Sequence, residues 1–367
     1  MGSPGFRGAR SCLDGRRRER GRSSTWSHHP TTAVAEGGGP VRVLCHQASN
    51  IKPLGAHFNL SQGQRLSGVT GKGMPDISTI LILTHSNTLS LQGYFLALLV
   101  KEWEARGIRV MIHHDLESSV SADVCLVHVD LSLVPPRYIE FAQRYPNTIN
   151  LHITDIRKRS YSRNRVMRGD GYDGPVIVKS SLNFAGEPER RGRPRRLRRI
   201  WEKFNRELSR RAPPGLPFQQ PSITNKQHYL VFPKRRMLPV GWLDRDDIVV
   251  ERFRPEQHDD NFVLREWYFL GDRECYSCEI SKDPIFTSGT ECPALEAPPP
   301  DAIRKLRREF RIDYGKIDYA IDREGIPVLF DVNKTIGLVN PNADRARKMA
   351  GILADGLSSL VGPQGTR

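Results

Sequence analysis

The stretch from Ile312 to Gly337, IDYGKIDYAIDREGIPVLFDVNKTIG, most constrains how this chain can fold. Strand-like runs lie on both sides of the turn sequence at 322–325, which predicts a β-hairpin. On such a hairpin Asp318 and Asp331 can face each other, and Asn333, two residues beyond Asp331, leaves the same face. Two carboxylates and an amide oxygen, completed by phosphate oxygens, suit Mg²⁺. The sequence therefore predicts a metal–nucleotide site on this hairpin.

The hairpin resembles the metal-binding signature of the ATP-grasp superfamily. The signature is an Asp, twelve residues, a second acid, one residue and an Asn, with a Gly shortly after, here Asp318, Asp331, Asn333 and Gly337. The resemblance implies that Lys316, two residues before the first Asp, contacts phosphate or acyl-phosphate. Three positions depart from the family: Asp331 replaces a usual Glu, Ile336 a usual Pro, and Lys316 the commoner Arg. A Lys cannot form the bidentate clamp of a guanidinium.

Composition bounds the rest of the chain. A length of 367 residues with 38% hydrophobic content predicts a soluble protein of two or three domains. No apolar run approaches the roughly 20 residues of a membrane span. The first thirty residues lack an apolar h-region, so we expect no secretory signal. The six cysteines are scattered, which predicts reduced thiols and a cytoplasmic location. Cys275 and Cys278 lie in a strand-like run that points them to opposite faces, against a zinc or redox role.

The net charge of +15 comes from two stretches. Residues 1–73 hold eleven Lys and Arg against three Asp and Glu, and residues 185–212 hold eleven against four. The first stretch is rich in Gly, Arg and Ser and is predicted to be a disordered basic tail. We expect translation to begin at or near Met74, with a transit peptide as the alternative.

From Ile77 to Ile153 strands alternate with helices, which predicts a right-handed βαβ arrangement with a parallel sheet. The resemblance implies a small Rossmann-like domain here, at 74–153, ahead of a two-lobed ATP-grasp domain. The fold class is therefore α/β and α+β. Ligands bind beyond the carboxyl ends of parallel strands, so the loop His85–Thr88 is expected either to hold part of an acceptor substrate or to cap the next helix.

Two lysines are predicted to reach nucleotide phosphates. Lys158 lies near a helix start that Thr154 or Asp155 is expected to cap, and the resemblance gives it a phosphate role. Lys179 ends a strand and precedes a loop containing Gly, an arrangement in which an ammonium and backbone N–H groups can hold phosphates. The resemblance makes this loop a mobile phosphate lid formed by Asn183, Gly186 and Glu187.

The segment DDIVVERFRPE resembles the family's hinge. The resemblance implies that Glu251 and the backbone of Arg252 and Phe253 meet adenine, and that Glu256 binds the ribose hydroxyls. The next run predicts a hairpin turned at Gly271-Asp272, and the resemblance makes its Arg265 a phosphate ligand. A surface ion pair of Arg265 with Glu266 or Glu279 is the alternative.

Residues 190–212 interrupt this plan with an Arg-rich stretch of helical periodicity. We expect a solvated basic helix, and a face for RNA or an acidic protein is the less favoured interpretation. The predicted lobes are 154–250, which contains this insertion, and 251–361, which contains the hairpin. Residues 362–367 form a short tail.

The sequence thus predicts an ATP-dependent ligase that uses ATP and Mg²⁺ or Mn²⁺. A small-molecule or peptide carboxylate would be phosphorylated, with Lys316 and Arg265 stabilising the charge that develops, and an amine or thiol acceptor would displace phosphate. A phosphotransferase on the same fold and a noncatalytic nucleotide- or RNA-binding protein remain alternatives. Substrate identity and oligomeric state are not predicted.

Overall fold

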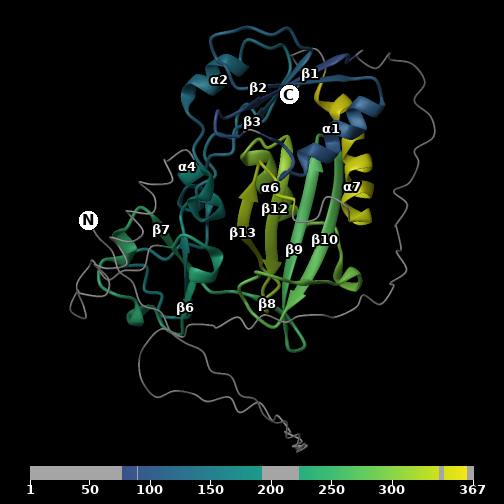
Figure 1. Ribbon diagram of the computed structural model, residues 1–367. Helices are drawn as coiled ribbons and strands as arrows, with labels where there is room; N and C mark the ends of the chain where they lie inside the picture. The colour runs from purple at the N-terminus through teal and green to yellow at the C-terminus, as the bar shows by residue number, and fades with distance from the viewer. Residues whose placement is uncertain (1–76, 89, 192–222, 339–342, 362–367) are drawn as a thin grey trace, which may run out of the picture. The chain divides into compact units, whose positions relative to one another are not determined.

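The computed structural model describes residues 77–88, 90–191, 223–338 and 343–361 (Figure 1). The predicted basic tail at 1–73 and the short tail at 362–367 lie outside these ranges, as does the Arg-rich stretch after Arg191. The described residues form three sheets with mixed helix and strand content, an α+β composition.

A parallel sheet forms from the first described strands, in the order β2-β1-β3-β4. Every pair in it is parallel, which confirms the predicted parallel sheet. Alternate residues of β1 enter two cores, Ile80 and Ile82 on the side of α1, and Leu81 and Leu83 on the side of α2. The elements are β1 Thr79–Thr84, α1 Leu96–Ala105, β2 Arg109–His113, β3 Val124–His128, α2 Pro136–Ala142 and β4 Thr148–Ile149.

An antiparallel three-stranded sheet follows, in the order β6-β5-β7. Its core packs around Trp242, whose ring meets Phe232 edge to face. The elements of this part are α3 Lys158–Tyr161, β5 Val176–Ser180, η1 Asn183–Gly186, α4 Glu187–Arg191, η3 Lys226–His228, β6 Leu230–Phe232, η4 Arg235–Met237, η5 Trp242–Asp244 and β7 Ile248–Arg252.

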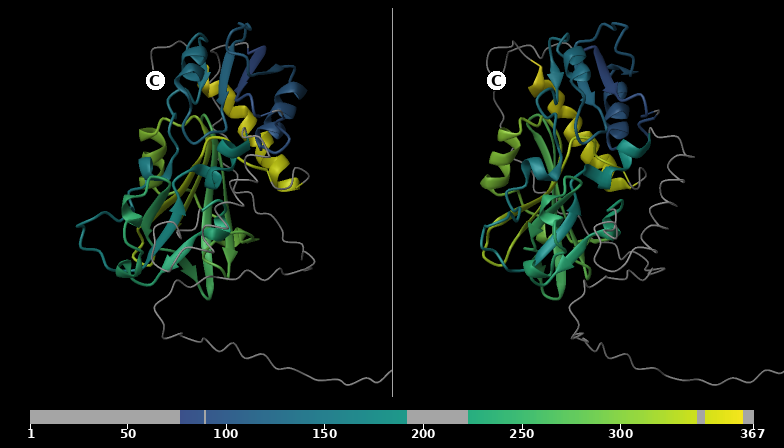
Figure 2. Two further views of the ribbon diagram at one scale, coloured as in Figure 1. Left: turned by 60° about the vertical axis from the view of Figure 1, so that its left-hand side comes forward. Right: turned by 90° about the vertical axis from the view of Figure 1, so that its left-hand side faces the viewer.

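The largest sheet has the order β11-β10-β9-β12-β13, with β8 paired to β9. Helix α6 packs into a core with β9, β12 and β13, while α7 lies along α1 (Figure 2), where Trp103 Nε1 donates to the Ala354 carbonyl at 3.2 Å. The elements are β8 Glu256–His258, β9 Asn261–Leu270, β10 Arg273–Ser281, β11 Thr290–Glu291, η6 Pro293–Leu295, α6 Asp301–Glu309, β12 Tyr314–Ile321, β13 Pro327–Asn333, α7 Asp344–Ala354 and η7 Asp355–Leu360.

Both predicted hairpins form, as β9–β10 and β12–β13. The predicted helix cap at Thr154 or Asp155 is wrong, because α3 begins at Lys158. Arg157 holds the capping position, and its side chain makes no capping hydrogen bond. Asp155 instead accepts hydrogen bonds from the Arg157 backbone and guanidinium. The two cysteines of the C-x-x-C lie apart as expected, with Cys278 buried and Cys275 packed against the core of α1 and α7.

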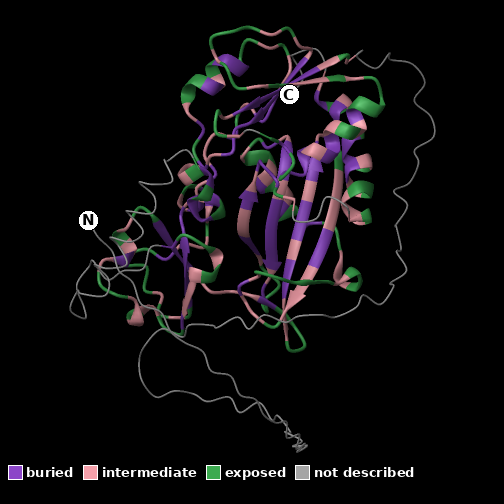
Figure 3. Ribbon diagram, in the orientation of Figure 1, coloured by how far each residue is buried: buried purple, intermediate pink, exposed green. Residues whose placement is uncertain are grey.

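Strand β3 is buried along its whole length (Figure 3), including His128 at its end. The His128 ring meets the Tyr94 ring edge to face at 4.8 Å, and neither ring nitrogen has a hydrogen-bond partner in the described part of the chain. Burial lowers the pKa of His128 to about 3, although Asp130 opposes this shift. The folded protein therefore keeps this imidazole neutral.

We predict that His128 makes the protein sensitive to mild acid. In the unfolded chain His128 takes up a proton near pH 6.5, whereas in the folded chain it does not until about pH 3. The contribution of neutral His128 to the free energy of unfolding is therefore fully present above pH 6.5 and is lost as the pH falls. His128→Phe should reduce the loss of unfolding free energy between pH 7 and pH 5 by about 2 kcal/mol. Urea unfolding at both pH values measures it.

The matched control is His258→Phe, because the His258 side chain is 59% exposed. This change should leave the pH dependence of the unfolding free energy unaltered. Equal pH dependence in wild type and His128→Phe would contradict the prediction.

Candidate functional site

The β12–β13 hairpin sets two carboxylates opposite each other. Asp318 pairs in register with Asp331, and Lys316 with Asn333. A β-bulge follows between Asp318 and Tyr319, where the register shifts. Asp331 and Asn333, two residues apart, leave the same face of the strand. The facing carboxylates confirm the predicted hairpin geometry, while their metal role stays a prediction.

Asp331 is held by groups from α3 and its own strand. Its Oδ1 accepts from Lys158 Nζ at 3.0 Å, from the Tyr161 hydroxyl at 2.9 Å and from the Val332 N–H at 3.0 Å. Burial alone would raise the pKa of Asp331, but Lys158 and then Lys226 lower it below its ordinary value. Asp331 is therefore an ionised carboxylate.

Asp318 is less well satisfied. It is 5% exposed, and its Oδ1 accepts no hydrogen bond from the described residues, although Lys316 Nζ lies 3.0 Å away. Lys316 Nζ instead donates to Glu266. Burial raises the pKa of Asp318; Lys316 opposes this, while Glu266 and Asp331 add to it. A buried carboxylate oxygen without a donor is suited to a bound cation.

A second buried ion pair joins Lys179 and Glu251. These residues come from the neighbouring strands β5 and β7, and Lys179 Nζ lies 2.7 Å from Glu251 Oε2. Glu251 Oε1 is buried without a hydrogen-bond partner among the described residues. Lys179 Nζ also lies 5.1 Å from the centre of the Phe330 ring. The predicted second phosphate lysine is therefore already neutralised by a predicted adenine ligand.

A first cavity of about 790 Å³, its open mouth included, lies between the three-stranded sheet and the hairpin. Its walls are mainly apolar, and the backbone after β7, the predicted hinge, runs along it. The lining includes the apolar residues Ile177, Phe262, Leu264, Ile285, Phe286 and Phe330, the hinge residues Glu251, Arg252 and Phe253, and the charged residues Lys158, Lys179, Lys226, Asp318 and Asp331.

A second cavity of about 1020 Å³ lies on the other side of the same carboxylates. Most of the residues that line it are polar or charged, although apolar atoms form most of its wall, as in the first cavity. Asp130 is its most constrained acid. Asp130 accepts from the Tyr94 hydroxyl at 2.5 Å, from Thr335 Oγ1 at 2.9 Å and from Arg191 at 3.2 Å. Other polar lining residues are Asn183, Lys226, Lys316, Asp318, Asp331 and Asn333.

The predicted lid lies at this second cavity. Phe184, Ala185 and Gly186 all have positive φ, at 45°, 50° and 73°. A Cβ on Gly186 would lie 2.7 Å from a Leu182 methyl carbon, so this turn needs glycine. The backbone N–H of Asn183 donates to Ser132 at 2.8 Å.

The third lid residue, Glu187, begins α4. Its carboxylate lies 3.9 Å from the guanidinium of Arg191, one helical turn later. The lid sequence therefore leads directly into a basic residue of the second cavity.

Arg265 and Glu256 do not reach the first cavity. They pair with each other, Arg265 Nη2 lying 2.6 Å from Glu256 Oε1, and line a separate groove. Arg265 also donates to the Leu295 carbonyl at 2.6 Å, and the Ile321 N–H donates to Glu256 at 2.7 Å. These bonds pair the two side chains with each other, and their predicted contacts with phosphate and ribose stay predictions. The alternative partners of Arg265, Glu266 and Glu279, are not used either.

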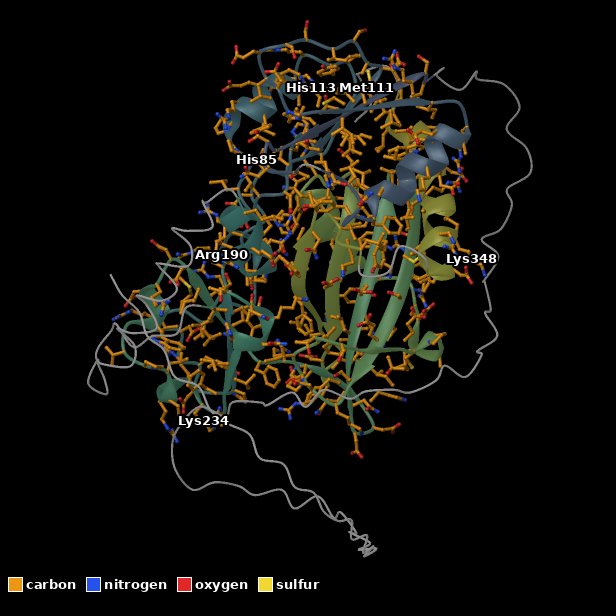
Figure 4. The ribbon with its side chains drawn as sticks, in the orientation of Figure 1. His85, Met111, His113, Arg190, Lys234 and Lys348 are labelled. Atoms are coloured by element: carbon orange, nitrogen blue, oxygen red, sulfur yellow. The ribbon has the colours of Figure 1, made fainter. Side chains whose placement is uncertain are left out.

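The loop His85–Thr88 is outside both cavities. Its residues are not among those that line them. The predicted helix cap is wrong, because α1 follows Phe95 and has no side-chain cap, while the acceptor role stays a prediction. His85 lies beside Tyr138, with ring centres 5.7 Å apart (Figure 4).

Sequence reasoning missed several residues that line the cavities. Asp130 follows a predicted parallel strand, and the rule that ligands bind at carboxyl ends of strands could have found it. Tyr229 lines the first cavity and Lys226 lines both, but they follow residues 192–222 without any motif. No sequence signal marks them.

The described residues lack both a cluster of metal-binding side chains and a membrane-spanning helix. They contain no group of three or more His, Cys, Asp or Glu side chains arranged to hold a metal ion. They also contain no helix with the length and apolar character needed to cross a membrane. A metal at the hairpin would therefore use the two carboxylates together with non-carboxylate ligands.

No protein-family model and no curated protein matches the chain. Solved structures do resemble it. A RimK domain ATP-grasp protein from Sphaerobacter thermophilus is 13% identical, with 77% of this chain and 100% of that chain covered and a TM-score of 0.41. N5-carboxyaminoimidazole synthetase from Staphylococcus aureus, complexed with ADP, is 9% identical, with 78% of each chain covered and a TM-score of 0.45. Macrocyclase MdnC from Microcystis aeruginosa, bound with precursor peptide MdnA, is 14% identical, with 75% and 99% covered and a TM-score of 0.38.

Two cavities, the first bordered by the predicted hinge and the second lined mostly by polar and charged residues, share Asp318 and Asp331.

We predict that Lys179 and Glu251 stabilise the fold only as a pair. Lys179→Met should lower the unfolding free energy by about 3 kcal/mol, because it leaves the Glu251 carboxylate buried without its partner. Adding Glu251→Gln removes that charge and should restore most of the loss. Urea unfolding of the two single variants and the double variant measures the coupling.

The control is Arg236→Met, which breaks an ion pair with Asp173 whose side chains are 73% and 45% exposed. It should change the unfolding free energy by less than about 1 kcal/mol. Additive effects of Lys179→Met and Glu251→Gln would rule out the coupling.

Proposed function

We propose that this chain is an ATP-grasp enzyme that couples MgATP to ligation of a carboxylate with an amine or thiol. One observation carries the proposal: two cavities, the first bordered by the predicted hinge and the second lined mostly by polar and charged residues, share the facing carboxylates Asp318 and Asp331. A slot with apolar side chains and a hinge backbone suits a nucleotide base, and a chamber rich in polar and charged side chains suits a charged substrate. The proposed parts are a Rossmann-like domain at 74–153 and ATP-grasp lobes at 154–250 and 251–361.

The residues of the hairpin fit Mg²⁺ or Mn²⁺. Asp318 offers a buried oxygen that accepts no hydrogen bond from the described residues, although Lys316 Nζ lies 3.0 Å away. Asn333 offers an amide oxygen on the same face as Asp331. Hard divalent cations take such oxygen ligands and share them with nucleotide phosphates. When bound there, the metal ion would neutralise phosphate charge and orient the terminal phosphate.

Separate groups of residues would bind the adenine, the phosphates and the terminal phosphate of the nucleotide. Glu251 and the backbone of Arg252 and Phe253 would meet the adenine edge, since they line the apolar cavity. Lys158 and Lys179 would bind phosphates at its charged end. The lid residues Asn183, Gly186 and Glu187 would close over the terminal phosphate from the second cavity.

The reaction proposed has two balanced steps. A substrate carboxylate oxygen bonds to the γ-phosphorus while the bond to the β–γ bridging oxygen breaks, and ADP leaves. An amine or thiol then bonds to the acyl carbon, inorganic phosphate leaves, and the acceptor's proton passes to solvent. Lys316, buried between Glu266 and Asp318, would stabilise charge on the transferred group.

A phosphotransferase is the second candidate. It is favoured by one feature, that the metal and phosphate residues alone suffice to move a phosphoryl group to a hydroxyl. The polar second cavity could hold either class of acceptor. The nucleic-acid alternative depends on residues 192–212, which lie outside the described part of the chain.

We predict that ATP stabilises the protein and that Mg²⁺ increases the effect. Binding to the folded state raises the melting temperature by mass action. In Asp318→Asn the increase caused by Mg²⁺ should be lost, because the amide removes one of two metal carboxylates. This position is preferable to Asp331, whose removal would also unpair Lys158. Thermal unfolding with ATP, with and without Mg²⁺, measures it.

The matched control is Asp272→Asn, at an exposed turn where the side chain is 61% exposed. It should keep the full effect of Mg²⁺. The same Mg²⁺ effect in wild type and Asp318→Asn would remove the metal assignment.

We predict that the phosphorylated product is an acyl phosphate. With MgATP, hydroxylamine and a panel of carboxylates, any carboxylate that stimulates ADP formation should also give a hydroxamate, because hydroxylamine captures an activated acyl group. ADP formation and hydroxamate colour are measured together. A phosphorylated alcohol with no hydroxamate would identify the phosphotransferase instead.

A further inference from the structure

Lys226 is the cation that the two cavities have in common. Among the residues that line both, the charged ones are Lys226, Asp318 and Asp331. The other lysines of the site line one cavity each, Lys158 and Lys179 the first and Lys316 the second. Lys226 therefore lies where the cavities meet, beside the facing carboxylates.

Lys226 also differs from these lysines in its partners. Lys158 is 3.0 Å from Asp331, Lys179 is 2.7 Å from Glu251, and Lys316 is paired with Glu266. Within the described ranges no carboxylate lies within 4.0 Å of Lys226 Nζ, and the side chain is half-buried. Its positive charge nevertheless acts on both Asp318 and Asp331. An ammonium in this position is available to an anion that enters between them.

The local structure explains how Lys226 is held there. Lys226 begins the short helix η3, which follows Asn225. The Asn225 side chain caps this helix by accepting a hydrogen bond from the Gln227 N–H at 2.8 Å. Strand β6 follows at once and pairs with β5, the strand that carries Lys179. The pairing of β5 with β6 therefore fixes Lys226 relative to the phosphate lysine of the first cavity.

We propose that Lys226 is a catalytic residue that binds the terminal phosphoryl group, the group that passes from the nucleotide in the first cavity to the acceptor in the second. The inference rests on the proposed function and adds to it a residue that no motif identifies. During transfer the phosphoryl group lies at the junction of the two cavities, and its negative charge is exposed to both. Lys226 can follow that charge because it faces both, whereas Lys158 and Lys179 face only the nucleotide side.

The test compares two nucleotides that differ by the terminal phosphate, and it requires no knowledge of the acceptor. Isothermal titration measures binding of Mg²⁺ with ADP and with the imido analogue of ATP. In Lys226→Met the affinity for the analogue should fall about tenfold or more, because a charge-assisted contact to phosphate is removed. The affinity for ADP should stay within about twofold. Lys226→Arg, which keeps the charge, should retain most of the preference for the triphosphate.

The matched control is Lys234→Met, an equal change at an exposed lysine just after β6 (Figure 4). It should alter neither affinity. Melting temperatures of all variants, measured without nucleotide, show whether each is folded.

The possible results separate the two proposals. A wild-type protein that binds neither nucleotide would overturn the proposed function and this inference with it. Binding of both nucleotides by wild type, with equal weakening of both or of neither in Lys226→Met, would overturn the inference alone. A selective loss of the triphosphate in Lys226→Met, with none in Lys234→Met, supports the assignment.

Discussion

Two carboxylates that face each other inside a protein repel each other, and the site depends on how the chain supports Asp318 and Asp331. The hairpin register fixes their separation, so relief has to come from cations on other elements. Lys158 arrives from α3, and Lys226 from the segment before β6. The carboxylate pair therefore requires the hairpin and the three-stranded sheet to be assembled together.

The lysines of the site lie among nearby carboxylates. Four lysines stand against four acids: Lys158, Lys179, Lys226 and Lys316, and Asp318, Asp331, Glu251 and Glu266. Three of the lysines are already paired, so an entering phosphate has to compete with carboxylates that are fixed at short distance. A metal ion on Asp318 and Asp331 would take over those acids and free Lys158. Metal and nucleotide should therefore bind more strongly together than either alone.

Local patterns predicted the parts of the site that local geometry decides. The alternation and turn of residues 312–337 fix the pairing of Asp318 with Asp331, because a strand has a period of two. The pairing of Arg265 with Glu256 was not predicted because it is tertiary: β8 folds back on β9 and brings the two together. Lys226 could not be found, since its position depends on how the chain returns to β5 after a long intervening segment.

The two cavities are lined in part by different segments of the chain. The first cavity and the carboxylates belong to residues after Ile156, whereas Tyr94 and Asp130 of the second cavity come from the segment with the parallel sheet. Tyr94 and Asp130 also contact the end of the hairpin stretch, because Asp130 accepts from Thr335 at 2.9 Å and Tyr94 forms a β-bridge with Gly337. If the second cavity holds the acceptor as proposed, changes at Tyr94 and Asp130 would alter the choice of substrate while the hinge and the carboxylates stay in place.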